Sequence, residues 1–233
     1  MKKVYLTVDD GPSKDFREKV DFLYSSNIPA IFFCLGSLME KRAKDVVYAI
    51  NKGFVIGNHS YDHPKFSEIS TGEAKKQIQR TDRIIEKLYQ KAGVKRLTKT
   101  FRFPHGDKGN EETKEIYQSV LREFGYKQPN FKQIKLYGNP DFMKDIDVCW
   151  TYNSKDYTVT RYRLLGMKSP YGYSSQKLVL DRIDENDHKH GKGLNYSRTR
   201  DIILVHDSEI ISDLFYGLVN KLISKKTQFE LPA

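Results

Sequence analysis

The stretch Tyr5–Ser13, YLTVDDGPS, governs how the rest of this chain is interpreted. The run Val4–Val8 is apolar and rich in β-formers, which predicts a short buried strand. Two adjacent carboxylates, Asp9 and Asp10, follow it and lead into a tight Gly-Pro turn. Parallel-strand folds carry their chemistry at the carboxyl ends of strands, so these acids are candidate functional groups. On these residues alone, a turn that merely caps the next helix is an equal alternative.

Downstream, short apolar runs alternate with segments of helical periodicity. Further strands are predicted at 30–35, 54–57, 99–103, 148–152, 201–205 and 228–231. Helices are predicted at 14–26, from a cap at Ser37 to Gly53, from Thr71 to Gly93, and at 111–124, 176–183 and 210–224. Such alternation predicts an α/β fold whose strands pair in parallel through right-handed crossovers. The 233 residues suit one domain, and the sequence shows no internal repeat.

The chain carries 40 Lys and Arg against 30 Asp and Glu, a net charge of +10. Such an excess can mark an anionic partner, but the lysines are scattered and no run of five like charges occurs. We therefore expect a solvated basic surface, no nucleic-acid partner and no integral membrane segment. Cys34 and Cys149 lie in apolar runs, as small core residues do. No apolar export signal follows Met1, so the chain as given is expected in the cytoplasm, or outside if a leader was removed.

Polar residues follow several other predicted strands at the point where each ends. They are His59 and His63, Arg102, Asp156 and His206. In a barrel of parallel strands these ends meet at one mouth, so residues far apart in sequence become neighbours. We expect all of them to lie near the two acids of the first strand.

The pair His59 and His63 has the spacing of metal ligands. Two imidazoles four residues apart, with one carboxylate, make a three-ligand set that leaves a position open. Pro64 disfavours helix at His63, so the pair is expected in a turn. Taken alone, two exposed loop histidines explain the spacing equally well, and the nearby acids favour the metal site.

Five motifs together resemble the polysaccharide deacetylase family, which is carbohydrate esterase family 4 or the NodB homology domain. In the family's order they are Thr7–Gly11 (TVDDG), His59–His63 (HSYDH), Arg102–Gly106 (RFPHG), Asp156–Tyr157 (DY) and Leu204–His206 (LVH). They span nearly the whole chain, and the first two are the most specific. The resemblance implies a distorted (β/α) barrel, TIM-barrel-like with fewer or irregular strands, formed by residues 1–233 as one domain.

The resemblance also implies a ligand set and a base. Asp10, His59 and His63 would hold one divalent metal ion, expected to be Zn²⁺, with Co²⁺ or Ni²⁺ as alternatives. A metal of this kind makes water acidic enough to act as a nucleophile near neutral pH. Asp9 would be the general base, and Arg102 would orient Asp9 and keep it ionised.

The remaining implied roles concern the leaving group and the substrate. His206 would protonate the leaving amine, with its pKa raised by Asp156. The backbone N–H of His105 would stabilise the oxyanion, and Leu204 would wall the acetyl pocket. The family has tyrosine where His105 stands, so a side-chain contact to the sugar is in doubt. Tyr157 replaces the usual tryptophan and keeps an aromatic ring for sugar stacking.

These inferences predict a metal-dependent deacetylase that removes the N-acetyl group of an amino sugar in a glycan and releases acetate. One alternative is an amidohydrolase or O-acetyl esterase on the same fold, since fold does not fix substrate. Another is a glycan-binding relic, which would be expected to lack the base or the acid. His188 and His190 match nothing in the family and are expected to be solvated, with a second, adventitious metal site as the alternative.

Overall fold

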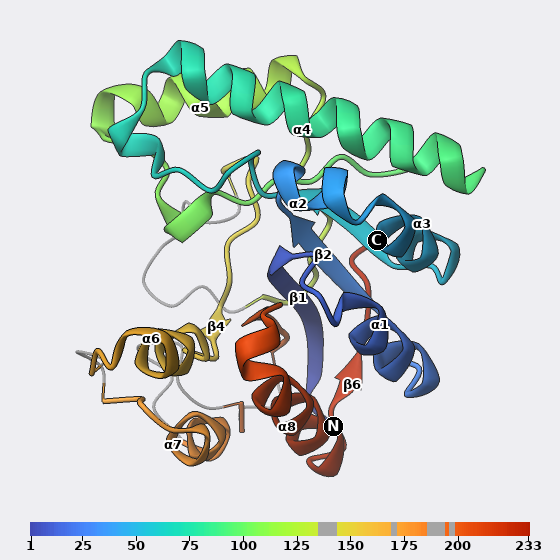
Figure 1. The fold of residues 1–233 in the computed structure, drawn as a ribbon, viewed down its shortest axis with the longest axis vertical. Coiled ribbons are helices and arrows are strands. Elements are labelled where there is room, and N and C mark those ends of the chain that lie inside the picture. The colour runs from blue at the N-terminus through green and yellow to red at the C-terminus, as the bar shows by residue number, and fades with distance from the viewer. Residues whose placement is uncertain (135–143, 169–171, 186–193, 196–198) are drawn as a thin grey trace.

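The computed structural model describes residues 1–134, 144–168, 172–185, 194–195 and 199–233, and its centre is one sheet (Figure 1). The strand order is β3-β2-β1-β5-β4, and β6 pairs with β1. All these pairings are parallel, as predicted. The strands are β1 Lys3–Gly11, β2 Ala30–Cys34, β3 Val55–Asn58, β4 Tyr152–Asn153, β5 Asp201–His206 and β6 Gln228–Phe229.

The helices pack around this sheet, as expected of an α/β fold with crossover connections (Figure 1). Every residue of β2 is buried, which explains its unbroken apolar sequence AIFFC. The α-helices are α1 Phe16–Ser25, α2 Gly36–Lys41, α3 Ala43–Asn51, α4 Thr71–Ala92, α5 Glu111–Glu123, α6 Tyr157–Leu165, α7 Gln176–Asp181 and α8 Ser212–Ser224.

Helix α4 follows its sequence signals closely. The hydroxyl of Ser70 accepts from the backbone N–H of Glu73 at its start, and Gly93 ends it in the left-handed region with φ 67°. Its buried side includes Ala74 and Ile85. This long helix packs beside α2 and α3 and covers the edge of the sheet where β3 lies (Figure 1).

Two predicted strands are wrong in extent. Within 99–103, Phe101 forms only an isolated bridge with Asn58, because Pro104 soon follows and has no N–H to continue a ladder. Within 148–152, β4 begins only at Tyr152, because the N–H of Val148 donates instead to Phe101 O at 2.8 Å. The wall between β3 and β4 is therefore held by an isolated bridge and a few hydrogen bonds in place of a ladder, which makes the barrel-like arrangement irregular.

Two helix predictions also fail. Ser37 does not cap a helix, since α2 starts at Gly36 behind Leu35, and Arg42 separates α2 from α3. Helix α6 was missed, because its sequence YTVTRYRLL buries only Thr158 and Val159 and shows little periodicity.

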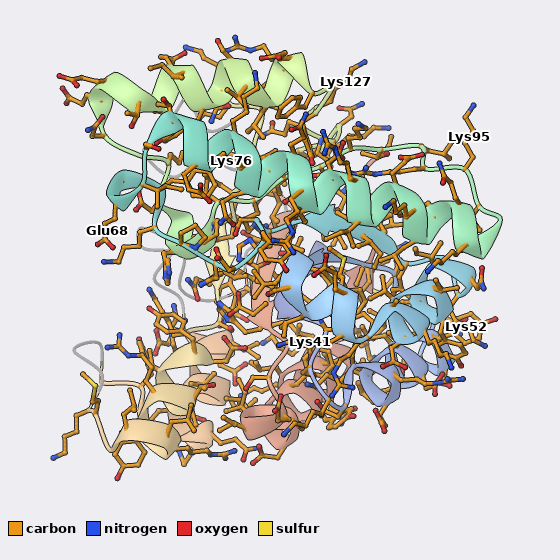
Figure 2. All side chains as sticks on the ribbon, turned by 45° about the horizontal axis from the view of Figure 1, so that its top comes forward. Lys41, Lys52, Glu68, Lys76, Lys95 and Lys127 are labelled. Carbon is orange, nitrogen blue, oxygen red and sulfur yellow. The ribbon has the colours of Figure 1, made fainter. Side chains whose placement is uncertain are left out.

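The surface agrees with a dispersed positive charge. Lys41, Lys76 and Lys127, which belong to α2, to α4 and to the segment after α5, are spread over one side of the molecule (Figure 2). None of the helices in the described ranges is long and apolar enough to cross a bilayer.

Candidate metal centre and active site

The end of β1 carries a bulge that turns both acids toward one place. Successive side chains of a strand normally point to opposite faces, so Asp9 and Asp10 would be separated. The register with β2 shifts between Asp9 and Gly11, and Asp10 has φ 69°. A bulge of this kind re-aims a side chain. As a result, Nε2 of His59 faces Asp9 Oδ2 at 3.7 Å and Asp10 Oδ1 at 3.3 Å.

Three of the predicted residues form a cluster that fits a metal ion. Asp10 Oδ1 lies 3.3 Å from His59 Nε2 and 3.1 Å from His63 Nε2. Asp10, His59 and His63 each offer one ligand atom, and these atoms lie within 4.8 Å of one another. Asp10 Oδ1 is buried and has no hydrogen-bond partner of good geometry. A buried carboxylate oxygen that faces two imidazole nitrogens is a suitable donor set for a divalent cation.

The histidine tautomer supports ligation. Nδ1 of His59 lies 2.8 Å from the backbone carbonyl of Arg102, a position from which only a protonated nitrogen can donate. Nε2 then keeps its lone pair for a metal. A histidine that binds a metal through one ring nitrogen usually donates the N–H of its other ring nitrogen to a carbonyl or carboxylate oxygen. His59 itself is only 2% exposed, so its ring is fixed by packing as well.

The backbone is strained at the same place. Asp10, His63 and His105 have φ values of 69°, 68° and 58°, in the left-handed region that non-glycine residues rarely occupy. Such conformations cluster at functional sites, where the surrounding structure holds them. Here they set the directions of one acid and two imidazoles.

Asp9 is held by a buried guanidinium. Arg102 Nη1 donates to Asp9 Oδ1 at 2.7 Å and to Thr7 Oγ1 at 2.7 Å. Its Nε donates to the carbonyl of Val148 at 2.9 Å, so the arginine is itself anchored to the irregular wall. Asp9 Oδ2 remains free of this clamp and faces the metal cluster.

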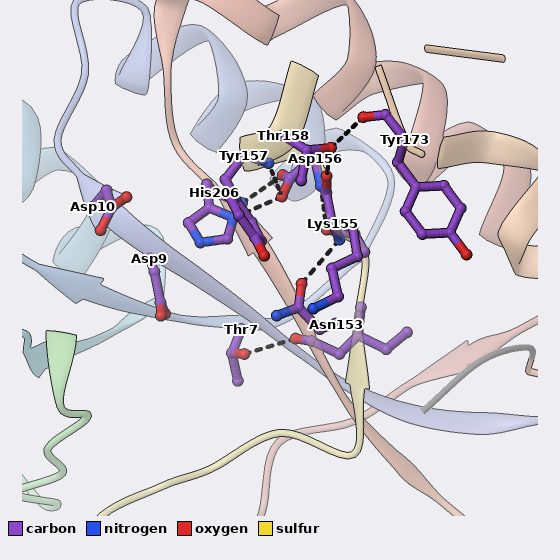
Figure 3. A network of polar contacts seen from close by, with 12 residues as sticks. Thr7, Asp9, Asp10, Asn153, Lys155, Asp156, Tyr157, Thr158, Tyr173 and His206 are labelled. Atoms are coloured by element: carbon purple, nitrogen blue, oxygen red, sulfur yellow. Dashed lines mark hydrogen bonds and ion pairs between the residues drawn. The ribbon is translucent and has the colours of Figure 1, made fainter. Parts of the chain in front are cut away.

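On the other side of β1, the partly exposed His206 forms a pair with the buried Asp156 (Figure 3). Nδ1 of His206 lies 2.6 Å from Asp156 Oδ1, and the backbone N–H of His206 donates to Asp156 Oδ2 at 2.7 Å. Burial disfavours the imidazolium, but the carboxylate of Asp156 outweighs it and raises the pKa of His206 to about 9. The imidazole is therefore a cation at neutral pH, and its Nε2 side is left for another partner.

The other predicted residues lie around these two centres. The rings of Tyr157 and His206 meet edge to face at 5.5 Å, and Leu204 is buried in β5. The ring of His105 meets that of His63 at 4.3 Å. Burial and the neighbouring His63 lower the pKa of His105. His188 and His190 lie outside the described residues.

One positioning residue was missed by the sequence reasoning. The buried side chain of Asn58, at the tip of β3, donates to the carbonyl of Ile78 and the hydroxyl of Tyr126 and accepts from the N–H of Ser60. It thereby shapes the turn that carries His59. The sequence feature that could have indicated this role is an asparagine that ends an apolar run and directly precedes HSYDH.

Comparison with known proteins places the first part of the chain in a described family. A family model described as polysaccharide deacetylase matches residues 1–129. A peptidoglycan-N-acetylglucosamine deacetylase of Bacillus cereus is 40% identical over 106 residues, which are 45% of this chain and 37% of that protein. A chitooligosaccharide deacetylase of Sinorhizobium fredii is 31% identical over 104 residues, 44% of this chain and 46% of the relative. The chain thus matches less than half the length of these relatives.

A solved structure extends the likeness to the later elements. The peptidoglycan deacetylase PdaC from Bacillus subtilis superposes with a TM-score of 0.63 and 26% identity. The superposition covers 98% of this chain and 86% of that one, so it includes β5 and α8 as well as β1. The α/β fold with a barrel-like parallel sheet, predicted from the sequence, is confirmed by this likeness.

Proposed function

The chain belongs to the polysaccharide deacetylase family, and we propose that it hydrolyses the N-acetyl group of an amino sugar in a glycan, releasing acetate and leaving a free amine. The observation that carries this proposal is the placement of two different centres on one sheet edge. A cluster of Asp10, His59 and His63 lies on one side of the β1 tip, and the cationic His206 lies on the other. Amide hydrolysis needs both an activated water and a proton for the leaving nitrogen.

Asp10, His59 and His63 would hold one divalent ion, and two imidazoles with one carboxylate favour Zn²⁺. When bound, the ion would supply Lewis acidity for water and for the acetyl carbonyl. The buried Asp10 Oδ1, which faces the Nε2 atoms of His59 and His63, and the tautomer of His59 support this assignment.

The chain's own residues supply the proton transfers. Asp9 would take the proton of the attacking water on Oδ2, while Arg102 keeps Oδ1 occupied and holds the carboxylate in place. His206 would give a proton from Nε2 to the leaving nitrogen, since its Nδ1 is engaged by Asp156. The backbone N–H of His105 would face the developing oxyanion.

The substrate would lie across the mouth between the two centres. Tyr157, which packs against His206, offers an aromatic ring to a sugar face, and Leu204 adds apolar surface for the acetyl methyl group. The named activities of the relatives, on peptidoglycan and on chitooligosaccharides, support an N-acetylated amino-sugar glycan as the substrate class.

The metal assignment is tested by elemental analysis of the wild type, His59→Ala and His105→Ala. We expect one equivalent of metal in the wild type, none in His59→Ala, and an unchanged content in His105→Ala. The last variant is the matched control, because it removes an imidazole that touches the cluster without belonging to it. Equal metal content in the wild type and His59→Ala would contradict the assignment.

The substrate class is tested with a panel. Zinc-loaded protein is incubated with N-acetylglucosamine oligomers, peptidoglycan fragments and acetylated xylan, and acetate is assayed. We expect acetate from the first two. Acetate from xylan alone would instead support the O-acetyl esterase alternative, and binding without any acetate would support a glycan-binding relic.

A further inference from the structure

Helix α1 places a lysine where a surface helix normally has an apolar residue. The side chain of Lys19 is 0% exposed, beneath the turn that follows Asp9 and Asp10. Its Nζ lies 2.6 Å from Asp207 Oδ1, and the side chain of Asp207 is also 0% exposed. A second carboxylate, Asp15, lies 2.8 Å from the same nitrogen but is 24% exposed. Lys19 and Asp207 therefore form a buried ion pair that the reaction described above does not use.

Asp207 joins the two strands that carry the reacting groups. It directly follows His206 in β5, and its backbone N–H donates to the carbonyl of Asp9 at 2.8 Å. Its Oδ2 accepts from the backbone N–H of Ser13 at 2.8 Å, and its Oδ1 accepts from the Ser13 hydroxyl. Asp207 thus contacts the β1 tip through its backbone N–H and the turn after Asp9 and Asp10 through its carboxylate, while it directly follows the general acid in the chain.

The contact between this carboxylate and the turn is close. A Cβ at Gly11 would lie 2.8 Å from Asp207 Oδ2, so only glycine fits between the carboxylate and the Asp10 bulge. A small shift of Asp207 would therefore move the backbone next to Asp10. The one cation that fixes Asp207 is Lys19, because the remaining contacts to this carboxylate in the described residues come from Ser13.

We propose that Lys19 is a positioning residue that, through Asp207, fixes the distance between the metal cluster at the β1 tip and the acid His206 on β5. The inference rests on the proposed function, because the distance between the metal cluster and His206 matters only if both act in the same reaction. Without Lys19, Asp207 becomes a buried charge with no counter-ion, and the structure relaxes by moving Asp207 or admitting water. Either change displaces the Asp10 bulge.

The test compares Lys19→Met with Lys2→Met. Lys2 is the matched control, because it forms an ion pair with Asp201 in which each side chain is only 7% exposed. This pair lies at the opposite end of β1 and β5 from Lys19 and Asp207. The affinity for Co²⁺ is measured by titration of the metal-free proteins well below their melting temperatures, followed by kcat and KM on a glycan. A purely structural role lowers the melting temperature in both variants and leaves Co²⁺ affinity unchanged.

We expect Lys19→Met to weaken Co²⁺ binding about tenfold or more, as outer-shell changes do, and to lower kcat with little change in KM. Lys2→Met should keep both values. The double variant Lys19→Met/Asp207→Asn should recover Co²⁺ affinity toward the wild type, because the amide can still accept from the Ser13 N–H and carries no unpaired charge.

Several results would overturn the proposal. They are equal Co²⁺ affinity in Lys19→Met and the wild type, an equal loss in Lys2→Met, no recovery in the double variant, or a wild type that binds no metal. A wild type that binds Co²⁺ but releases no acetate would instead overturn the proposed function, and the affinity comparison would still decide the role of Lys19.

Discussion

Replacing Asp156 by asparagine should move the alkaline limb of the pH–rate profile toward acid. The variant keeps the shape of the side chain and can still accept from the backbone N–H of His206. It removes the negative charge that lies 2.6 Å from Nδ1. Burial, which disfavours the imidazolium, is then no longer opposed by this carboxylate. His206 should therefore lose its proton at a lower pH.

The size of the effect follows from the pKa. A rise from 6.5 to about 9 corresponds to about 3 kcal/mol in favour of the imidazolium, at ~1.4 kcal/mol per pKa unit. In the wild type at pH 8, roughly nine-tenths of His206 is protonated. In Asp156→Asn the pKa should fall toward the ordinary value of about 6.5, with Asp9 and Asp10 still favouring the imidazolium; at a pKa of 6.5 roughly 3% would be protonated at that pH. The ratio of the two kcat values should therefore grow from near 1 in acid to as much as about 30-fold at pH 8.

The assay is kcat against pH from 5.5 to 10 for both proteins, with NMR titration of the His206 ring as an independent readout. Metal content is measured alongside, since neither Asp156 nor His206 belongs to the cluster. An alkaline limb that stays in place while NMR records a lowered pKa would show that His206 is not the proton donor. An unchanged pKa would refute the electrostatic argument itself.

Three further predictions follow from the same contacts. Asp9→Asn should retain metal and lose about 100- to 10,000-fold in kcat, and loss of metal would mean that the roles of Asp9 and Asp10 are reversed. In metal-free protein, the raised pKa of His206 adds stability that is fully present below pH 6.5 and is lost as pH rises through about 9. Urea unfolding should therefore show the free energy of unfolding of the wild type falling by up to about 3 kcal/mol more than that of Asp156→Asn across this window. Parallel curves would contradict the linkage. Gly57→Ala should lower the free energy of unfolding by about 1–3 kcal/mol, because its Cβ would lie 2.6 Å from the ring of Phe33, and an unchanged urea midpoint would argue against this close packing.

The sequence predicts the central strands well, because β1, β2 and β5 are buried on both faces and read as continuous apolar runs. It fails over most of 99–103 and 148–152, where an isolated bridge and a few hydrogen bonds to distant residues replace a ladder. Pairing of that kind depends on tertiary packing, which the strand propensity of the local sequence does not predict.

The candidate site, like the fold, is predicted from the sequence only in part. The ligand types and the positions of Asp10 and His206 at strand ends are visible in the sequence. The bulge that turns Asp10 beside Asp9 is not, because it arises from the shifted register with β2. The sequence gives no sign that Lys19 is buried, although it follows Phe16 by three positions and so lies on the same face of α1. Only the structure brings Asp207 to it.

The central claim is tested most directly by measuring acetate and free amine together during incubation with N-acetylglucosamine oligomers. Protein stripped with a chelator, and the same protein reloaded with Zn²⁺, are compared. We predict no product from the stripped protein and equal amounts of acetate and amine from the reloaded one. Zinc-loaded protein that yields neither product, or stripped protein that is equally active, would contradict the account.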